Sequence, residues 1–351
     1  MKTHKIALYP GDGIGQEVVA EAVRVLDAIQ QRSKTFHLET ENIPWGCDYE
    51  AKTGQIAPPN FLEKLRPFDA IFLGALGDPR KRPDHMTLEP LICIRQSFDQ
   101  YACVRPAKLF PGISARVTAN TPIDMVIVRE NSEGEYFSCG GRFKIGDPDE
   151  VAVQTALHTR KGVTRILRFG FELARSRRRH LTMITKSNAL KHGMVMWDQI
   201  LETLRSEYPD VEADQMHVDA ASMDFVRRPQ RFDVVVASNL FGDILSDLAG
   251  AIVGGLGLLP SANLNPERHF PSMFEPVHGS APDIAGKGIA NPVATILSSA
   301  MMLDWLGEKE AATAIRQAVE STLGAGHATV DLGGRLKTHE MTDRILEQLP
   351  A

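Results

Sequence analysis

Residues 233–247 read DVVVASNLFGDILSD, and this stretch combines a buried strand, a turn and a helix. The apolar run at 234–236 is typical of a strand that is covered on both faces. The polar residues after it therefore lie at the carboxyl end of that strand, where α/β proteins bind their ligands. The stretch predicts an α/β fold with a functional site beside residues 239–247.

Strand and helix patterns alternate on both sides of this stretch. The pattern predicts buried strands at 5–9, 70–73, 125–128 and 181–184, and helices at 163–174, 194–208, 244–253, 293–306 and 309–323. Strands separated by helices indicate a largely parallel sheet. Because no repeat or linker interrupts the alternation, we expect a second domain that is inserted into the first. Residues 137–155 break the rhythm with several glycines, and the pattern fits either a hairpin for subunit contact or a surface loop.

The composition is that of an ordinary globular protein. With 351 residues, of which 43% are hydrophobic and 24% charged, the chain has room for two domains. A formal net charge of −5 argues against a nucleic-acid binder, which would carry a basic face. The cysteines form no CxxC pair, and no apolar run has the form of a signal peptide or a membrane span. We therefore expect a cytoplasmic protein that binds neither nucleic acid nor membranes.

The glycine-rich turn at residues 11–15, GDGIG, follows a strand and opens a helix. A Rossmann fingerprint, GxGxxG, would require glycine at the position of Gln16. The turn therefore fails as a dinucleotide signature, although a helix N-terminus there could still offer N–H groups to a ligand.

Asp243 and Asp247 are the strongest chemical signal. They are four residues apart, so a helix brings both carboxylates to one face, where they repel each other unless a cation lies between them. Oxygen ligands of this kind suit Mg²⁺ or Mn²⁺. The alternative is one aspartate favoured by the helix dipole and one ordinary surface aspartate.

Three arginines, Arg95, Arg105 and Arg129, are candidates for binding carboxylates, because the guanidinium fork matches a carboxylate. Arg129 is the best of them, since it ends a buried strand and must face a cleft or a partner. Tyr136 could act as an acid or be a buried structural tyrosine. Lys186 follows another strand and could act as a base if neighbouring cations lower its pKa, or it could be simply solvated.

The loop at 274–292 is rich in glycine and proline and ends in Asn291, a good helix cap. Such loops often surround a ligand, although a plain connection is the alternative. If the ligand is a dinucleotide, Asp283 could accept hydrogen bonds from ribose hydroxyls and would repel a 2′-phosphate.

Taken in this order, the segments from residue 10 to residue 304 resemble the β-decarboxylating dehydrogenases, the family of isocitrate and isopropylmalate dehydrogenases. The runs 239–247 and 275–292 are its most specific parts. The resemblance implies the family's own non-Rossmann α/β fold, with two domains, largely parallel sheets and a dimerisation arm. Residues 1–99 and 252–351 would form the large domain, and 100–251 the inserted domain with the dimer interface and an arm around 137–155.

The resemblance also implies a role for each candidate residue. The substrate would be bound by Arg95, Arg105 and Arg129, and Mg²⁺ or Mn²⁺ by Asp243 and Asp247 together with Asp219 from the partner subunit. The catalytic residues would be Tyr136 and, from the partner subunit, Lys186. The NAD site would be lined by Ile14, Glu275, His278, Gly279, Asp283 and Asn291. The active form would be a homodimer with shared active sites. Its reaction would be the NAD-linked oxidation and decarboxylation of a small 2-hydroxy diacid.

The substrate is indicated by smaller segments. Residues 98–101 (FDQY) and 265–268 (NPER) look like the tartrate and D-malate branch, whereas Glu89-Pro90 departs from the tryptophan-glycine pair usual there. We therefore expect D-malate, yielding pyruvate and CO₂, or tartrate. Leu91-Ile92 echoes the leucine pair of isopropylmalate enzymes, which makes 3-isopropylmalate the alternative. A second alternative is that the chain is a non-catalytic regulatory subunit of the same fold. The presence of all the catalytic residues disfavours it.

Overall fold

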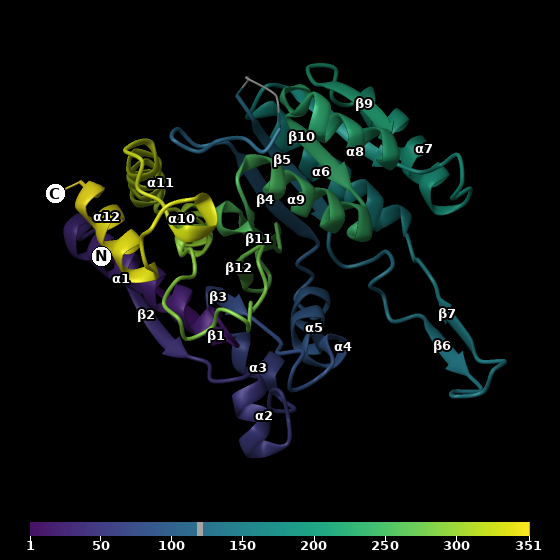
Figure 1. Ribbon diagram of the computed structural model, residues 1–351. Coiled ribbons are helices and arrows are strands. Elements are labelled where there is room, and N and C mark those ends of the chain that lie inside the picture. Colours follow the sequence, from purple (N-terminus) through teal and green to yellow (C-terminus); the bar gives the residue numbers. More distant parts are fainter. Residues whose placement is uncertain (118–121, 351) are drawn as a thin grey trace.

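The computed structural model describes residues 1–117 and 122–350 (Figure 1). Within them, ten strands form one sheet in the order β2-β1-β3-β12-β11-β4-β5-β10-β8-β9, and β6 and β7 form a separate hairpin. The strands are β1 (Lys2–Gly11), β2 (Phe36–Asn42), β3 (Ala70–Ala75), β4 (Ala102–Lys108), β5 (Asp124–Glu130), β6 (Gly140–Phe143), β7 (Val151–Gln154), β8 (His180–Thr185), β9 (Glu212–His217), β10 (Val234–Ala237), β11 (Pro260–Leu264) and β12 (Ser272–Pro276).

The sheet is parallel except at its centre, where β4 pairs antiparallel with both β5 and β11, and β11 pairs antiparallel with β12. All six residues of β3 and all four of β10 are buried. Strands covered by helices on both faces need continuous apolar sequences, which explains why these runs are readable in the sequence. The strand order also differs from that of a Rossmann fold, as the missing glycine after residue 15 predicts.

Two groups of helices cover the sheet (Figure 1). The α-helices are α1 (Gly15–Ser33), α2 (Cys47–Thr53), α3 (Phe61–Leu65), α4 (Asp84–Thr87), α5 (Glu89–Ser97), α6 (Arg160–Arg175), α7 (Gly193–Arg205), α8 (Val218–Arg227), α9 (Asn239–Val253), α10 (Val293–Leu306), α11 (Lys309–Gly324) and α12 (Thr338–Gln348). Helices α1, α10, α11 and α12 pack together beside β1, β3 and β12, whereas α6, α7, α8 and α9 pack around β5, β8 and β10. The first half of the sheet thus comes mainly from the two ends of the chain. The domain division at 99/100 and 251/252 stays a prediction.

Helix α9 begins five residues earlier than the apolar spacing predicts, at Asn239 and not at 244. The first turn interrupts the apolar spacing with Asn239, whose side chain binds Arg129, and with Gly242. Asp243 consequently lies in the second turn of α9, beyond the first turn in which the helix dipole is strongest. This placement disfavours the interpretation of Asp243 as a residue retained for the dipole.

Residues 140–154 form an antiparallel hairpin, β6–β7, that extends away from the rest of the chain (Figure 1). Its apolar side chains are exposed, with Phe143 62% and Ile145 71% accessible. Such a surface is unfavourable in water unless another surface covers it. No helix among the described residues is long and apolar enough to cross a membrane.

Candidate active site

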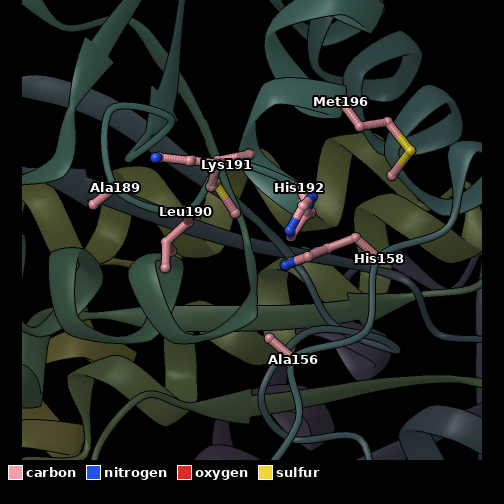
Figure 2. A pocket seen from close by; sticks show the side chains of 9 residues that line it. Ala156, His158, Ala189, Leu190, Lys191, His192 and Met196 are labelled. Carbon is pink, nitrogen blue, oxygen red and sulfur yellow. The ribbon is translucent and has the colours of Figure 1, made fainter.

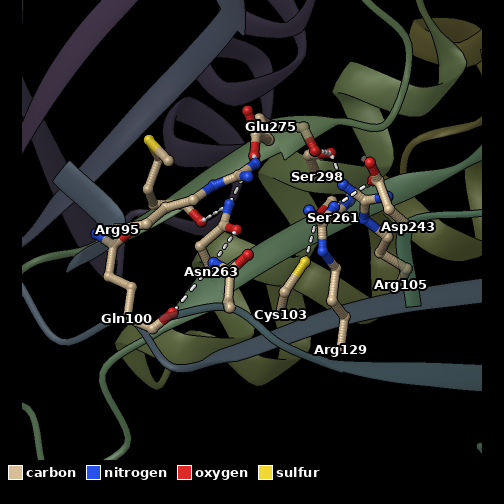
Figure 3. Close-up of polar contacts among 12 residues, drawn as sticks. Arg95, Gln100, Cys103, Arg105, Arg129, Asp243, Ser261, Asn263, Glu275 and Ser298 are labelled. Carbon is tan, nitrogen blue, oxygen red and sulfur yellow. Dashed lines mark hydrogen bonds and ion pairs between the residues drawn. The ribbon is translucent and has the colours of Figure 1, made fainter. Parts of the chain in front are cut away.

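A cavity of about 220 Å³ lies where β3 and β12 end and α5 and α9 approach them. Its polar lining consists of Arg95, Arg105, Arg129, Tyr136, Asp243, Glu275 and His278, and its apolar lining includes Leu73, Leu76, Leu88, Leu91, Ile92 and Val277. The structure therefore brings together the three arginines and the first predicted metal aspartate (Figure 3), and Tyr136 lines the same cavity.

Arg129, near the end of β5, is only 1% exposed, and its guanidinium is held on two sides. Asn239, the first residue of α9, accepts hydrogen bonds from Nε at 2.9 Å and from Nη2 at 2.6 Å. Nη1 donates to Oδ1 of Asp243, and the ring of Tyr136 lies 5.0 Å from the guanidinium carbon. Gly242 permits this approach, because a Cβ there would lie 2.6 Å from Cβ of Arg129.

The carboxylate of Asp243 accepts hydrogen bonds from three side chains. Oδ1 accepts from Arg129 and from Nη1 of Arg105 at 3.0 Å, and Oδ2 accepts from the hydroxyl of Tyr136 at 2.6 Å. Burial acts to raise the pKa of Asp243, but Arg129 and Arg105 hold it below its ordinary value, so the carboxylate is ionised at neutral pH. Arg105 also donates to Oγ of Ser246 at 2.7 Å.

Tyr136 is a protonated phenol in this setting. Burial raises its pKa, and so do the hydrogen bond to Asp243 and the negative charge of that residue. A tyrosine whose pKa is raised keeps its proton at neutral pH and can therefore donate it.

Arg95, on α5, forms a buried ion pair with Glu275, with Nη2 2.6 Å from Oε1. Asn263 of β11 donates to the same oxygen at 2.7 Å and in turn accepts a hydrogen bond from Asn131 at 2.9 Å. Because a buried ion pair requires satisfied partners, this network fixes the guanidinium at the wall of the cavity. Glu275, predicted for the NAD site, thus contacts a predicted substrate residue.

Asp247 is exposed one turn after Asp243 on α9. Desolvation by the surrounding protein, opposed by Arg105, raises its pKa. The other two residues implied for this centre lie apart from it: Lys186, after β8, pairs with Asp219, at the start of α8, with Nζ 3.0 Å from Oδ1. Within the described residues, no three His, Cys, Asp or Glu side chains are grouped to hold a metal ion. Within one chain, the residues predicted for the active site therefore form two separate groups, Asp243 with Asp247 and Lys186 with Asp219.

The loop between β12 and α10 is held against the start of α1. The backbone N–H of Ile14 donates to the carbonyl of Ser280 at 2.8 Å. His278 and Gly279 lie at the cavity, and burial lowers the pKa of His278, whose buried Nε2 has no hydrogen-bond partner among the residues that the structure describes. Asp283 is exposed on the same loop.

Asn291 is 6% exposed at the end of this loop. Its side chain accepts a hydrogen bond from the N–H of Val293 at 3.0 Å and donates to Asp331 at 3.0 Å. Asn291 thereby holds the backbone where the chain enters α10, and Pro292 is the N-cap residue of that helix.

Three supporting residues were not selected from the sequence: Asn239, Ser246 and Asn263. Asn239 and Ser246 lie within the quoted run 233–247, so their spacing from Asp243 was a usable signal. Asn263 was detectable only as a polar residue in a short apolar strand. Its role depends on the pairing of β11 with β4 and β12, which the sequence does not reveal.

A second cavity, of about 610 Å³, lies outside this centre (Figure 2). It is lined by Ala156 and His158, which follow the hairpin, and by residues 189–194 and Met196, which follow Lys186. Nδ1 of His158 lies 3.3 Å from Nε1 of Trp197, on α7. None of the predicted site residues lines this cavity, although its position connects the hairpin to the Lys186 segment.

The isocitrate/isopropylmalate dehydrogenase family model matches residues 5–345. The chain therefore belongs to this family, and it is an enzyme of the decarboxylating dehydrogenase class. A probable tartrate dehydrogenase/decarboxylase of Agrobacterium vitis is 53% identical to it over 99% of this chain and 98% of its own. D-malate dehydrogenase (decarboxylating) of Escherichia coli K12 is 50% identical, with 98% of each chain covered.

The fold agrees with this assignment. The crystal structure of isocitrate dehydrogenase from Methylococcus capsulatus superimposes with a TM-score of 0.89 at 40% identity, covering 98% of this chain and 99% of that one. The predicted α/β fold of this family and the predicted likeness to its tartrate and D-malate branch are both confirmed.

Proposed function

We propose that the chain catalyses the NAD-linked, Mg²⁺- or Mn²⁺-dependent oxidation and decarboxylation of a small 2-hydroxy diacid. D-malate, yielding pyruvate and CO₂, and tartrate are the proposed substrates. The observation that carries the proposal is one cavity in which three arginines, Tyr136 and Asp243 converge. The names of the relatives, tartrate dehydrogenase/decarboxylase and D-malate dehydrogenase, support the same substrates.

The arginines would bind the two carboxylates of the substrate. A carboxylate oxygen, Oδ1 of Asp243, already lies between Arg105 and Arg129, and another, from Glu275, contacts Arg95. These contacts support the view that each guanidinium is oriented for a carboxylate and that it is pre-positioned by buried neighbours.

Asp243 and Asp247 would hold the divalent cation, with Asp219 contributed by the partner subunit. The two α9 carboxylates lie on successive turns, and Asp247 is exposed, so they fit a hard cation that needs further oxygen ligands. The cation would supply Lewis-acid polarisation of the carbonyl at C2.

NAD would lie along the loop after β12, contacting Ile14, Glu275, His278, Gly279, Asp283 and Asn291. The unpartnered Nε2 of His278 supports a ligand at this place, because a buried polar atom normally has a partner. The exposed carboxylate of Asp283 favours NAD over NADP, whose 2′-phosphate it would repel.

Two residues would move protons. Lys186 of the partner subunit would take the proton of the C2 hydroxyl during oxidation. Tyr136 would return a proton to C3 after the carboxylate at C3 has left as CO₂. The raised pKa of Tyr136 supports this role, since it leaves the phenol protonated.

The enzyme would be a homodimer with two shared active sites, each with Lys186 and Asp219 from one subunit and the arginines from the other. The exposed hairpin and the cavity beside Lys191 and His192 are the surfaces that a second copy would cover (Figure 2). Each chain would comprise a large domain, 1–99 with 252–351, and an inserted domain, 100–251.

One observation favours a second substrate, 3-isopropylmalate. Leu88, Leu91 and Ile92 line the cavity beside Arg95 and give that end an apolar wall. An apolar wall favours the binding of a substrate with an alkyl group at C3, whereas it offers no hydrogen-bond partner to a hydroxyl at C3.

The proposal is tested by following NADH formation with Mn²⁺ and D-malate, L-tartrate, meso-tartrate, 3-isopropylmalate or isocitrate in parallel. Preferred turnover of D-malate or a tartrate supports the proposal. Preference for 3-isopropylmalate assigns the chain to the alternative, and a folded, NAD-binding protein that is silent with every substrate contradicts both.

A further inference from the structure

Another cavity, of about 290 Å³, opens at the edge of the sheet opposite the active site. It lies at the amino ends of β1, β3 and β12, whereas the active-site cavity lies where β3 and β12 end. A ligand in this cavity would therefore be separated from the substrate by the length of the strands.

Three permanent cations line the cavity, and none of them forms an ion pair with a carboxylate within the described residues: Lys2, Arg66 and Arg268. Nζ of Lys2 donates to the carbonyl of Leu306 at 3.1 Å, and Nη2 of Arg268 donates to the carbonyl of Trp305 at 2.8 Å. Arg66 has its guanidinium carbon 5.1 Å from the centre of the Phe270 ring.

The loop that carries Arg268 is held together by side-chain to backbone hydrogen bonds. Asn265, which is 1% exposed, accepts hydrogen bonds from the N–H groups of His269 at 2.7 Å and Phe270 at 3.1 Å. Arg268 itself has a φ of 59°, a left-handed conformation that is uncommon for a non-glycine residue. Its guanidinium carbon lies 4.0 Å from the centre of the Trp305 ring.

The same loop turns its acidic residue away. Glu267 accepts a hydrogen bond from the hydroxyl of Tyr101 at 3.0 Å and does not line the cavity. The segment 265–268, which the active site does not use, thus directs its arginine toward the cavity and its glutamate away from it.

The charged residues around the cavity indicate an anionic ligand. Among the described residues that line the cavity, Asp69 is the one carboxylate, and its Oδ2 accepts a hydrogen bond from the N–H of Lys5 at 2.7 Å. Glu308, whose Oε1 lies 2.9 Å from Nε2 of the lining residue His4, is a second carboxylate nearby, so the three cations still leave a net positive charge around the cavity. A volume of 290 Å³ equals that of roughly ten water molecules at about 30 Å³ each, which exceeds an inorganic anion and leaves room for an organic body.

We propose that this cavity binds a small organic dianion, a phosphate monoester or a dicarboxylate, at a site separate from the substrate site. The two guanidiniums lie against aromatic rings, and within the described residues their one side-chain hydrogen bond is that from Arg268 to the carbonyl of Trp305, so the other N–H groups can bind anionic oxygens of a phosphate or carboxylate.

The test is calorimetric titration of the full-length protein with glycerol 3-phosphate and, separately, with succinate. The double variant Arg66→Gln/Arg268→Gln is compared with Arg344→Gln, an exposed arginine of α12 that pairs with Glu347. We expect the double variant to bind the preferred dianion at least about tenfold more weakly, because charge-assisted hydrogen bonds are lost. The Arg344 variant should bind like the unmodified protein, and thermal unfolding should show that all three are folded.

Binding of glycerol 3-phosphate alone identifies the ligand as a phosphate monoester, and binding of succinate alone identifies it as a dicarboxylate. The proposal is overturned if neither probe binds at millimolar concentration. It is also overturned if the double variant retains full affinity, since the probe then occupies another site, such as the three-arginine cavity.

Discussion

The carboxylate of Asp243, a proposed ligand of the cation, contacts Arg105, Arg129 and Tyr136. Because Arg105, Arg129 and Tyr136 all donate to it, its side chain is positioned before any ligand arrives. The neighbouring arginines also keep it ionised, which a cation ligand must be.

Asp243→Asn should abolish metal-dependent turnover and leave the fold intact. The amide keeps the shape of the side chain but loses the charge that attracts Mg²⁺ or Mn²⁺. Turnover is measured against increasing Mn²⁺, and thermal unfolding serves as the control for folding. Normal activity of this variant in the presence of a chelator would show that the metal assignment is wrong.

Tyr136→Phe should lower kcat by about 10²- to 10⁴-fold, the usual contribution of a positioned acid. Substrate binding should change little, because the arginines remain. Steady-state kinetics gives both parameters, and Tyr49→Phe, on α2 and away from the cavity, is the matched control. An unchanged kcat in the Tyr136 variant would exclude the phenol as the proton donor.

The loop after β12 depends on α1 for its position. Gly13, two residues before the start of that helix, has a φ of 57°, and a Cβ there would lie 2.0 Å from the carbonyl oxygen of Ser280. The glycine-rich turn therefore serves loop packing, which explains why it lacks the Rossmann spacing.

Gly13→Ala should displace this loop and raise the KM for NAD, while destabilising the fold by about 1–3 kcal/mol through backbone strain. Gly54→Ala is the matched control, since Gly54 has a φ of 77° but open space around it. Kinetics and denaturant unfolding separate the two effects. An equal KM for NAD in both variants would contradict the placement of NAD along this loop.

The whole enzyme requires two chains if the residues of each active site come from both. The chain pairs Lys186 with Asp219 outside the cavity that holds Tyr136 and Asp243. An isologous dimer would bring each half-site to the complementary half of its partner.

Mixing two inactive variants tests this arrangement. Lys186→Ala and Tyr136→Phe subunits, refolded or co-expressed together, should regain about a quarter of the unmodified activity, because half of the dimers are hybrid and each hybrid has one intact site. Activity of the mixture is compared with that of each variant alone. No gain on mixing would mean that both residues act within one chain.

The sequence by itself determined the secondary-structure elements and the set of side chains available for chemistry. Continuous apolar runs such as 234–236 identified buried strands, because such strands leave no face for polar residues. The four-residue spacing of Asp243 and Asp247 placed both on one helix face, since that spacing is close to one helical turn. The long, ordered motifs identified the family, and through it they predicted a set of active-site residues.

Only the tertiary structure decided which of these groups meet. Arg95, Arg129 and Asp243 are far apart in the chain, and their meeting depends on the antiparallel centre of the sheet, where β4 joins β5 to β11. Strand pairing is set by long-range packing, so no local pattern reveals it. For the same reason the sequence showed neither the buried network of Asn263 and Glu275 nor the cationic cavity at the opposite edge of the sheet.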